Sequence, residues 1–292
     1  MKPPPFEYCA PTTLSEAVGL LSGSDSARLL AGGQSLMAML NMRYVIPDRL
    51  IDLNRVAELD YIREDEGEII IGSMTRQRTL QRSTLICERL PVMPKALRYV
   101  GHFQTRNRGT IGGSLCQLDP SGELPAVAMA YDAVVEAVGP NGMRQISFAE
   151  FPLMYMTSSI TPDEVVTAIR LKPWEGTTGC GFAEFARRHG DFALGGAVVL
   201  LRADTSNVIQ QASLTLFGIA EAPVRARDAE ALLTGHRIDS ALIDKACELC
   251  LPLATLADPY GSAEYRAHVA AAMAQKALAE AAADIASHRG RS

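Results

Sequence analysis

Two short glycine-rich stretches constrain the fold of this chain more than any other feature. The first reads AGGQSL (residues 31–36) and the second reads GTIGGSL (residues 109–115). Adjacent glycines cost backbone entropy and add no side-chain packing, so a folded chain keeps them where something must come close to its backbone. Both pairs border apolar runs, and we therefore expect both to form turns beside buried elements.

The hydrophobic period changes at the first glycine pair. RLLA, before the glycines, is typical of a short strand, and SLMAMLNMRYV, after them, has helical spacing. Gly32 and Gly33 are therefore predicted at a strand-to-helix turn. Consecutive amides at such a turn form a nest that binds an anion, and a helix that begins there adds its dipole.

Together, the two pairs predict a site for a pyrophosphate group, as in a dinucleotide. Gln34 and Ser35 in the first stretch, and Thr110 and Ser114 in the second, add side-chain donors. Neither stretch matches the Rossmann or P-loop pattern. A plain tight turn remains the alternative for each pair taken alone.

Composition narrows the classes of function. The 292 residues are 48% hydrophobic and 21% charged, as in globular proteins with a sizeable core, and the net charge of -5 argues against a nucleic-acid partner. We find no bilayer-spanning run and no apolar signal segment in MKPPPFEYCAP, so we expect a cytoplasmic protein. No motif predicts a catalytic residue or a metal ligand, and any chemistry would belong to a bound cofactor.

Two local motifs each allow two interpretations. Cys247 and Cys250 form a C-x-x-C in a segment with helical spacing, and no second pair lies nearby to complete a metal site. This favours two small core residues over a redox or metal role. ARRHGDFALGG gathers Arg187, Arg188 and His189 either at a solvated strand end or at a site.

The remaining sequence predicts mixed helices and strands. RLIDLNRV, GEIIIGSMT and DEVVTAIRLKP are typical of strands, AVVEAVGPNGMRQISFAEF of a hairpin turning at Asn141-Gly142, and GELPAVAMAYDA of a helix. LICERLPVMPKALRYVG is helical but interrupted by its prolines. After KPWEGTTG, where we place a domain boundary, GCGFAEFARR, AVVLLRAD and IQQASLTLFGIA predict antiparallel strands, followed by amphipathic helices.

Three long motifs resemble one protein family. They are AGGQSLMAMLNMRYVIPDRLIDLNRV (31–56), RNRGTIGGSLCQLDPSGELPAVAMAYDA (106–133) and FARRHGDFALGGAVV (185–199). The chain resembles the FAD-binding medium subunit of the molybdenum hydroxylases, as in carbon monoxide dehydrogenase, quinoline oxidoreductase, nicotine dehydrogenase and the flavin domain of xanthine dehydrogenase.

The resemblance implies the residues that would bind FAD. Ala31 to Ser35 match the loop that clamps the pyrophosphate from one side, and Thr110 to Ser114 match the loop on the other side. Glu123 matches an acidic residue that faces the ribityl hydroxyls, and a carboxylate acceptor suits hydroxyl donors; the alternative is a charge at a helix N-terminus. The full implied set is Leu29, Leu30, Ala31, Gly32, Gly33, Gln34, Ser35, Leu36, Val100, Thr110, Ile111, Gly112, Gly113, Ser114, Glu123, Val165, Val166 and Arg187.

Within that set, Val165 and Val166 match an apolar strand edge beside the isoalloxazine, and Arg187 matches a basic position near the flavin. Two positions depart from the family pattern. The first loop often has His where this chain has Gln34, and the second motif often reads LAHADP where this chain has LCQLDP, with Cys116 and Gln117. We expect backbone binding of pyrophosphate to survive both changes, whereas groups near the ring tune a flavin.

The family fold implies an α+β protein. An FAD-binding domain of the vanillyl-alcohol-oxidase type would span residues 1–174, with lobes at about 1–57 and 58–174. A smaller C-terminal domain (175–292) would hold a three-stranded antiparallel sheet and helices.

The family function implies electron transfer inside a heterotrimer, as a dimer of heterotrimers. A large subunit would oxidise substrate at a molybdenum cofactor, and a small subunit would pass electrons through two [2Fe-2S] clusters. FAD on this chain would pass them to an external acceptor. The alternatives are a self-contained flavin oxidase and a flavin-free assembly or binding protein.

Overall fold

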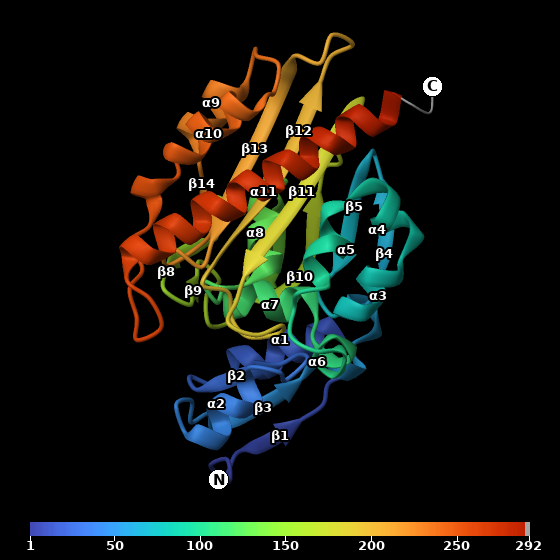
Figure 1. Ribbon diagram of the computed structural model, residues 1–292. Coiled ribbons are helices and arrows are strands. Elements are labelled where there is room, and N and C mark those ends of the chain that lie inside the picture. Colours follow the sequence, from blue (N-terminus) through green and yellow to red (C-terminus); the bar gives the residue numbers. More distant parts are fainter. Residues whose placement is uncertain (290–292) are drawn as a thin grey trace.

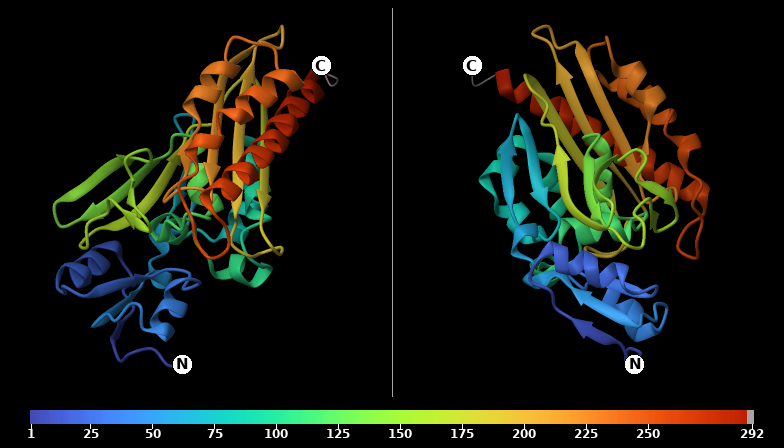
Figure 2. Two further views of the ribbon diagram at one scale, coloured as in Figure 1. Left: turned by 60° about the vertical axis from the view of Figure 1, so that its left-hand side comes forward. Right: turned by 180° about the vertical axis from the view of Figure 1, so that it is seen from behind.

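The computed structural model describes residues 1–289, which form two lobes and a C-terminal sheet (Figure 1). The N-terminal lobe lies at one end of the molecule in every view, and the C-terminal sheet with its helices lies toward the other end (Figure 2). Among residues 1–289, no helix combines the length and the apolar character needed to cross a bilayer.

The N-terminal lobe is a small parallel sheet with two short helices. Its elements are β1 (Glu7–Cys9), α1 (Leu14–Ser22), β2 (Ala27–Leu30), α2 (Leu36–Met42) and β3 (Arg49–Asp52), with strand order β1-β3-β2. Helix α1 begins where Thr13 Oγ1 accepts a hydrogen bond from the Glu16 amide at 3.2 Å, a side-chain N-cap. The predicted strand, glycine turn and helix at residues 27–42 are confirmed.

The second lobe is an antiparallel sheet covered by helices. The strands are β4 (Ile62–Asp65), β5 (Glu68–Gly72), β6 (Val134–Gly139), β7 (Gly142–Ser147) and β10 (Val165–Leu171), in the order β4-β5-β10-β6-β7. The helices are α3 (Gln77–Arg82), α4 (Thr84–Arg89), α5 (Val92–Leu97), α6 (Phe103–Arg108), α7 (Ile111–Gln117) and α8 (Glu123–Ala130), and β8 (Pro152–Met154) pairs with β9 (Thr157–Ser158). The predicted hairpin is confirmed, but its turn residues are Pro140 and Asn141 rather than Asn141 and Gly142, because Gly142 begins β7 opposite Gly139 with a φ of 102°.

The C-terminal sheet differs from the prediction by one strand. The three predicted strands are β11 (Thr177–Phe185), β12 (Gly195–Ala203) and β13 (Ile209–Phe217), and β14 (Val224–Arg225) adds a fourth beside β13. The prediction of three strands is therefore wrong, because a two-residue strand leaves no alternating pattern to detect. The helices are α9 (Arg227–Leu233), α10 (Ser240–Glu248) and α11 (Ala263–Arg289). Cys247 and Cys250 are buried among apolar side chains, which confirms the core interpretation.

One hydrophobic core joins the second lobe to the C-terminal sheet. The Tyr99 ring lies 5.1 Å from that of Phe182 on β11, which in turn stacks 5.7 Å from Phe217 on β13. At the same boundary Lys95 Nζ donates to Glu280 and Asp284 of α11, at 2.8 and 3.2 Å. The domain boundary predicted near residue 174 therefore lies between two sheets whose side chains pack together in one hydrophobic core.

Helix α11 crosses the C-terminal sheet at very short range (Figure 1). A Cβ on Gly181 of β11 would lie 1.9 Å from the carbonyl oxygen of Ala277, and one on Gly179 would lie 2.0 Å from that of Ala281. Real side-chain atoms do not approach a backbone oxygen so closely. Glycine on the strand and alanine on the helix are thus what allows this packing.

We expect Gly181→Ala to lower the free energy of unfolding by about 1–3 kcal/mol, because the added methyl group must push α11 away from the sheet. Gly19→Ala is the matched control. Gly19 lies in helix α1 with open space around it, so the same change there should raise stability by about 0.5–1 kcal/mol. Urea unfolding of both variants measures the two free energies of unfolding. Equal changes in the two variants would show that α11 does not pack closely against Gly181.

Candidate functional site

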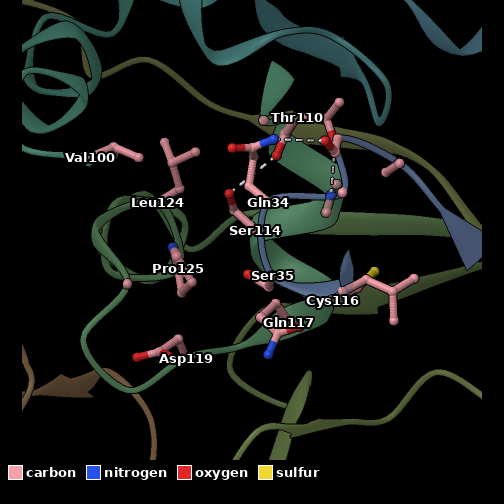
Figure 3. Close-up of a pocket in the computed structure, with 18 of the residues that line it drawn as sticks. Gln34, Ser35, Val100, Thr110, Ser114, Cys116, Gln117, Asp119, Leu124 and Pro125 are labelled. Atoms are coloured by element: carbon pink, nitrogen blue, oxygen red, sulfur yellow. Dashed lines mark hydrogen bonds between the residues drawn. The ribbon is translucent and has the colours of Figure 1, made fainter. Parts of the chain in front are cut away.

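A cavity of about 1000 Å³ lies where both lobes meet loops of the C-terminal domain (Figure 3). This volume is at the upper end of ligand pockets, with room for a dinucleotide. All the residues predicted to bind a cofactor line it except Leu30 and Ile111. Ile111 instead points into the core of the second lobe.

The first glycine loop forms one wall of the cavity and touches the second glycine segment. Gly33 has a φ of 72°, a left-handed conformation that favours glycine. A Cβ on Gly32 would lie 2.4 Å from the carbonyl oxygen of Arg108 and 2.7 Å from Cα of Gly109. Gly33 is therefore required by the turn, and Gly32 by the contact between two backbones.

This loop offers free backbone donors to the cavity. Within residues 1–289, the amides of Gly32, Gly33, Gln34 and Ser35 donate to no protein acceptor. The Gln34 side chain folds back and donates to the Gly32 carbonyl at 3.2 Å (Figure 3). Four consecutive free amides around a left-handed residue form the nest that the sequence predicted, and such a nest suits anionic oxygens.

The second glycine pair differs from the prediction. Gly112 and Gly113 do not form a turn before a helix, because they are already in the first turn of α7. Each amide from Ile111 to Ser114 donates within the protein, and the acceptors are Thr75 O, Ser73 O, Thr110 Oγ1 and Thr110 O. The prediction of a second amide nest is therefore wrong.

Close packing explains the second pair instead. A Cβ on Gly112 would lie 2.6 Å from Cβ of Ser73, the residue that follows strand β5. A Cβ on Gly113 would lie 2.9 Å from Thr110 Oγ1 and 3.5 Å from Cβ of Ala31 in the first loop. These glycines hold α7 against both the sheet and the first loop.

Another part of the cavity lining combines apolar and acidic groups. Val165 and Val166 begin strand β10, and both line the cavity while their side chains are buried. Glu123 lines it from the start of α8, and burial, with a contribution from the nearby charge of Glu184, raises the pKa of Glu123 to about 8. Burial also raises the pKa of Glu184, on β11, to about 7.

Loops of the C-terminal domain form the rim. The guanidinium of Arg187 lies 4.4 Å from the ring centroid of Tyr260, and Phe192, which also lines the cavity, is 76% exposed. Arg266, which is 2% exposed, donates to the Leu194 and Gly218 carbonyls and to Asp258 at 2.6 Å, which fixes the loop that carries Tyr260. Arg187 thus lines the cavity while its side chain stays exposed to solvent.

Sequence reasoning missed several lining residues, among them Arg28, Met39, Gln77, Asp119, Tyr155, Tyr260 and Arg266. Met39 and Asp119 lie within the long motifs but were not selected, and the others come from segments outside those motifs that only the folded chain brings together.

Two family models match the chain. One is the FAD binding domain in molybdopterin dehydrogenase, over residues 4–174, and the other is the CO dehydrogenase flavoprotein C-terminal domain, over residues 181–281. The chain belongs to the FAD-binding medium subunits of the molybdenum hydroxylases. It is thus an FAD-carrying oxidoreductase subunit, and of the three functions left open by the sequence, electron transfer in a multi-subunit complex is confirmed.

Relatives from this family match the chain over nearly its full length. It is 38% identical to the 6-hydroxypseudooxynicotine dehydrogenase complex subunit alpha of Paenarthrobacter nicotinovorans, covering 96% of each chain. The carbon monoxide dehydrogenase of Hydrogenophaga pseudoflava has a solved chain that is 35% identical, with a TM-score of 0.94 over 97% of this chain and 99% of that one. Quinoline 2-oxidoreductase of Pseudomonas putida 86 has one that is 31% identical, with a TM-score of 0.93 over 98% and 99%.

Proposed function

We propose that the first glycine loop holds the pyrophosphate of FAD through the free amides of Gly32 to Ser35. The observation that carries this proposal is the row of unpaired donors around Gly33, at the wall of a cavity large enough for the cofactor. Pyrophosphate oxygens are acceptors only, so they complement a surface made of amide donors. The predicted binding by backbone groups thus does not depend on the side chain of Gln34.

The other predicted residues have positioning roles in this proposal. Thr110 and the glycines of α7 keep the helix pressed against the first loop, as the 3.5 Å approach of a Gly113 Cβ to Ala31 indicates. Val165 and Val166 supply an apolar wall for the isoalloxazine, with Val100, Leu29 and Leu36 along the remaining surface. Bound FAD supplies electron transfer between one-electron donors and an external acceptor.

We further propose the assembly and its compartment. Relatives bear the names of medium chains or subunits, which supports a large molybdenum-cofactor partner and a small [2Fe-2S] partner. A dimer of such heterotrimers is proposed from the family resemblance. The six cysteines of the chain are all free thiols, which supports a reducing compartment, the cytoplasm. Co-purification of a yellow complex with two partner subunits tests the assembly, and a colourless single chain would contradict it.

We expect FAD to bind noncovalently, at about one per chain. Cys116 is the one cysteine of residues 1–289 that lines the cavity, and no His or Tyr of the sequence stands in a motif that would attach a flavin covalently. After acid precipitation, the flavin should stay in the supernatant. Flavin in the pellet would show a covalent link, and no flavin at all would contradict the proposed function.

A further inference from the structure

A polar side chain from outside the large cavity holds the first glycine loop. Asn54 lies half-buried in the turn Leu53–Arg55 after β3, and its Nδ2 donates to the carbonyl of Ala31 at 3.0 Å. Strands β2 and β3 are parallel, with Leu30 paired to Asp52, so the residues that follow the two strands meet at one edge of the sheet. Asn54 lines a separate cavity of about 300 Å³ and therefore contacts the loop from outside the proposed FAD site.

This hydrogen bond fixes the direction of one amide of the nest. The carbonyl of Ala31 and the amide of Gly32 belong to one planar trans peptide group, so they point in opposite directions. A carbonyl held toward Asn54 keeps the Gly32 amide pointed away from Asn54, and this amide donates to no protein acceptor within residues 1–289. The Gln34 side chain acts in the same way on the Gly33 amide, because it donates to the Gly32 carbonyl (Figure 3).

The Asn54 side chain is itself fixed by charged partners. Nη2 of Arg76 donates to Oδ1 of Asn54, and Nδ2 of Asn54 also donates to Oδ1 of Asp52. The other oxygen of Asp52 accepts from the Tyr8 hydroxyl at 2.6 Å. A guanidinium group only donates and an ionised carboxylate only accepts, so these partners permit one orientation of the Asn54 amide group. In that orientation the Nδ2 donor faces Ala31.

Arg76 also holds the second segment of the site. It lies directly before α3, where its backbone pairs with that of Thr110, and its Nη1 donates to the carbonyl of Arg108. The same carbonyl oxygen would lie 2.4 Å from a Cβ on Gly32. One guanidinium group therefore connects the backbone against which Gly32 packs with the asparagine that holds Ala31.

We propose that Asn54 and Arg76 are positioning residues for FAD, which keep the amides of the first glycine loop oriented toward the pyrophosphate before the cofactor binds. This rests on the proposed function, because the loop is the proposed pyrophosphate site. Donors that are already oriented lose less conformational freedom on binding, so more of the interaction energy remains as affinity. Loss of either side chain therefore weakens FAD binding, although neither residue lines the FAD site.

The experiment measures the dissociation constant of FAD for the full-length chain freed of flavin, by titration followed by flavin fluorescence. Asn54→Leu keeps a similar side-chain size and removes the amide contacts, and Arg76→Ala removes the guanidinium group. We expect each change to raise the dissociation constant about five- to tenfold, as for the loss of about one hydrogen bond. Urea unfolding of each flavin-free variant is recorded as well, because a residue that only stabilises the fold would shift the midpoint and leave the dissociation constant of the folded chain unchanged.

Free guanidinium ion gives a readout that is specific for Arg76. The side chain borders the cavity of about 300 Å³, so in Arg76→Ala a guanidinium ion has a route to the position of the lost group. Millimolar guanidinium chloride should restore most of the affinity of Arg76→Ala, whereas urea and sodium chloride at the same concentration should not. It should not restore Asn54→Leu, because leucine still occupies the position of the missing donor.

Arg49→Ala is the matched control. Arg49 is also half-buried, and it also donates to a backbone carbonyl, that of Leu20 at 3.2 Å, and to a side chain, that of Glu7 at 2.9 Å. It does not line the FAD site, so its dissociation constant should equal that of the unaltered chain.

An unchanged dissociation constant in Asn54→Leu or in Arg76→Ala, or an equal loss of affinity in Arg49→Ala, would overturn the proposal. Each of the two variants decides alone if the other does not fold. Absence of a rescue specific to guanidinium would overturn the role of Arg76. An unaltered chain that binds no FAD would instead contradict the proposed function.

Discussion

Replacing Gly33 by alanine should remove most of the FAD from the purified chain. Gly33 holds a φ of 72°, and an added Cβ would also lie 3.2 Å from Cγ of Met37 and 3.3 Å from Cδ1 of Leu30. The left-handed conformation costs a non-glycine residue about 1–2 kcal/mol, and relaxing it turns the free amides away from the cavity. We expect at least about a tenfold weaker affinity for alanine and no measurable binding for Gly33→Val.

Gly67→Ala is the matched control for this prediction. Gly67 has a φ of 81° in the turn between β4 and β5, with open space around it, so alanine there meets the same backbone strain away from the cavity. Both variants should lose similar stability in thermal unfolding, but only the Gly33 variant should lose flavin, measured by absorbance per chain. Full flavin occupancy in Gly33→Val would show that this loop does not hold the pyrophosphate.

The complete complex without FAD should still oxidise its substrate once but should stop turning over with its external acceptor. Gly32→Val is the change of choice, because its side chain would collide with the backbone of Arg108 and Gly109 and force the two loops apart. Electrons should still reach the [2Fe-2S] clusters, since FAD lies after them in the proposed order. Turnover with the acceptor should fall by about two orders of magnitude, as expected when an essential transfer step is removed.

The measurement is anaerobic bleaching of the clusters after addition of substrate. Bleaching should reach the same extent in the flavin-free complex and in the unaltered complex, and the Gly67→Ala complex should match the unaltered one in turnover as well. Clusters that no longer bleach would place FAD before them and contradict the proposed direction of electron flow.

Local sequence patterns predicted the parts of the fold that local forces determine. The turn at Gly32–Gly33 follows from a change of hydrophobic period. The hairpin follows from the turn-forming residues Pro140 and Asn141 between two strand patterns, with the positive φ at Gly142, where β7 begins. Both are decided by residues within a few positions. The burial of Cys247 and Cys250 also followed from helical spacing.

Long-range contacts decided what the sequence could not predict. Gly112 and Gly113 were expected to have free amides, but the acceptors that bind the start of α7 include the carbonyls of Ser73 and Thr75, nearly forty positions away in the chain. Strand β14 exists only because β13 offers it an edge.

The cavity is assembled from the first and the last parts of the chain, since Ala31 and Tyr260 both line it. During synthesis the ribosome must therefore release nearly the entire polypeptide before any complete pocket exists. FAD then binds only after synthesis of the chain, so every chain exists first in a flavin-free form. Because a ligand that binds only the folded state stabilises it, cellular FAD supply would set how long those empty chains survive proteolysis.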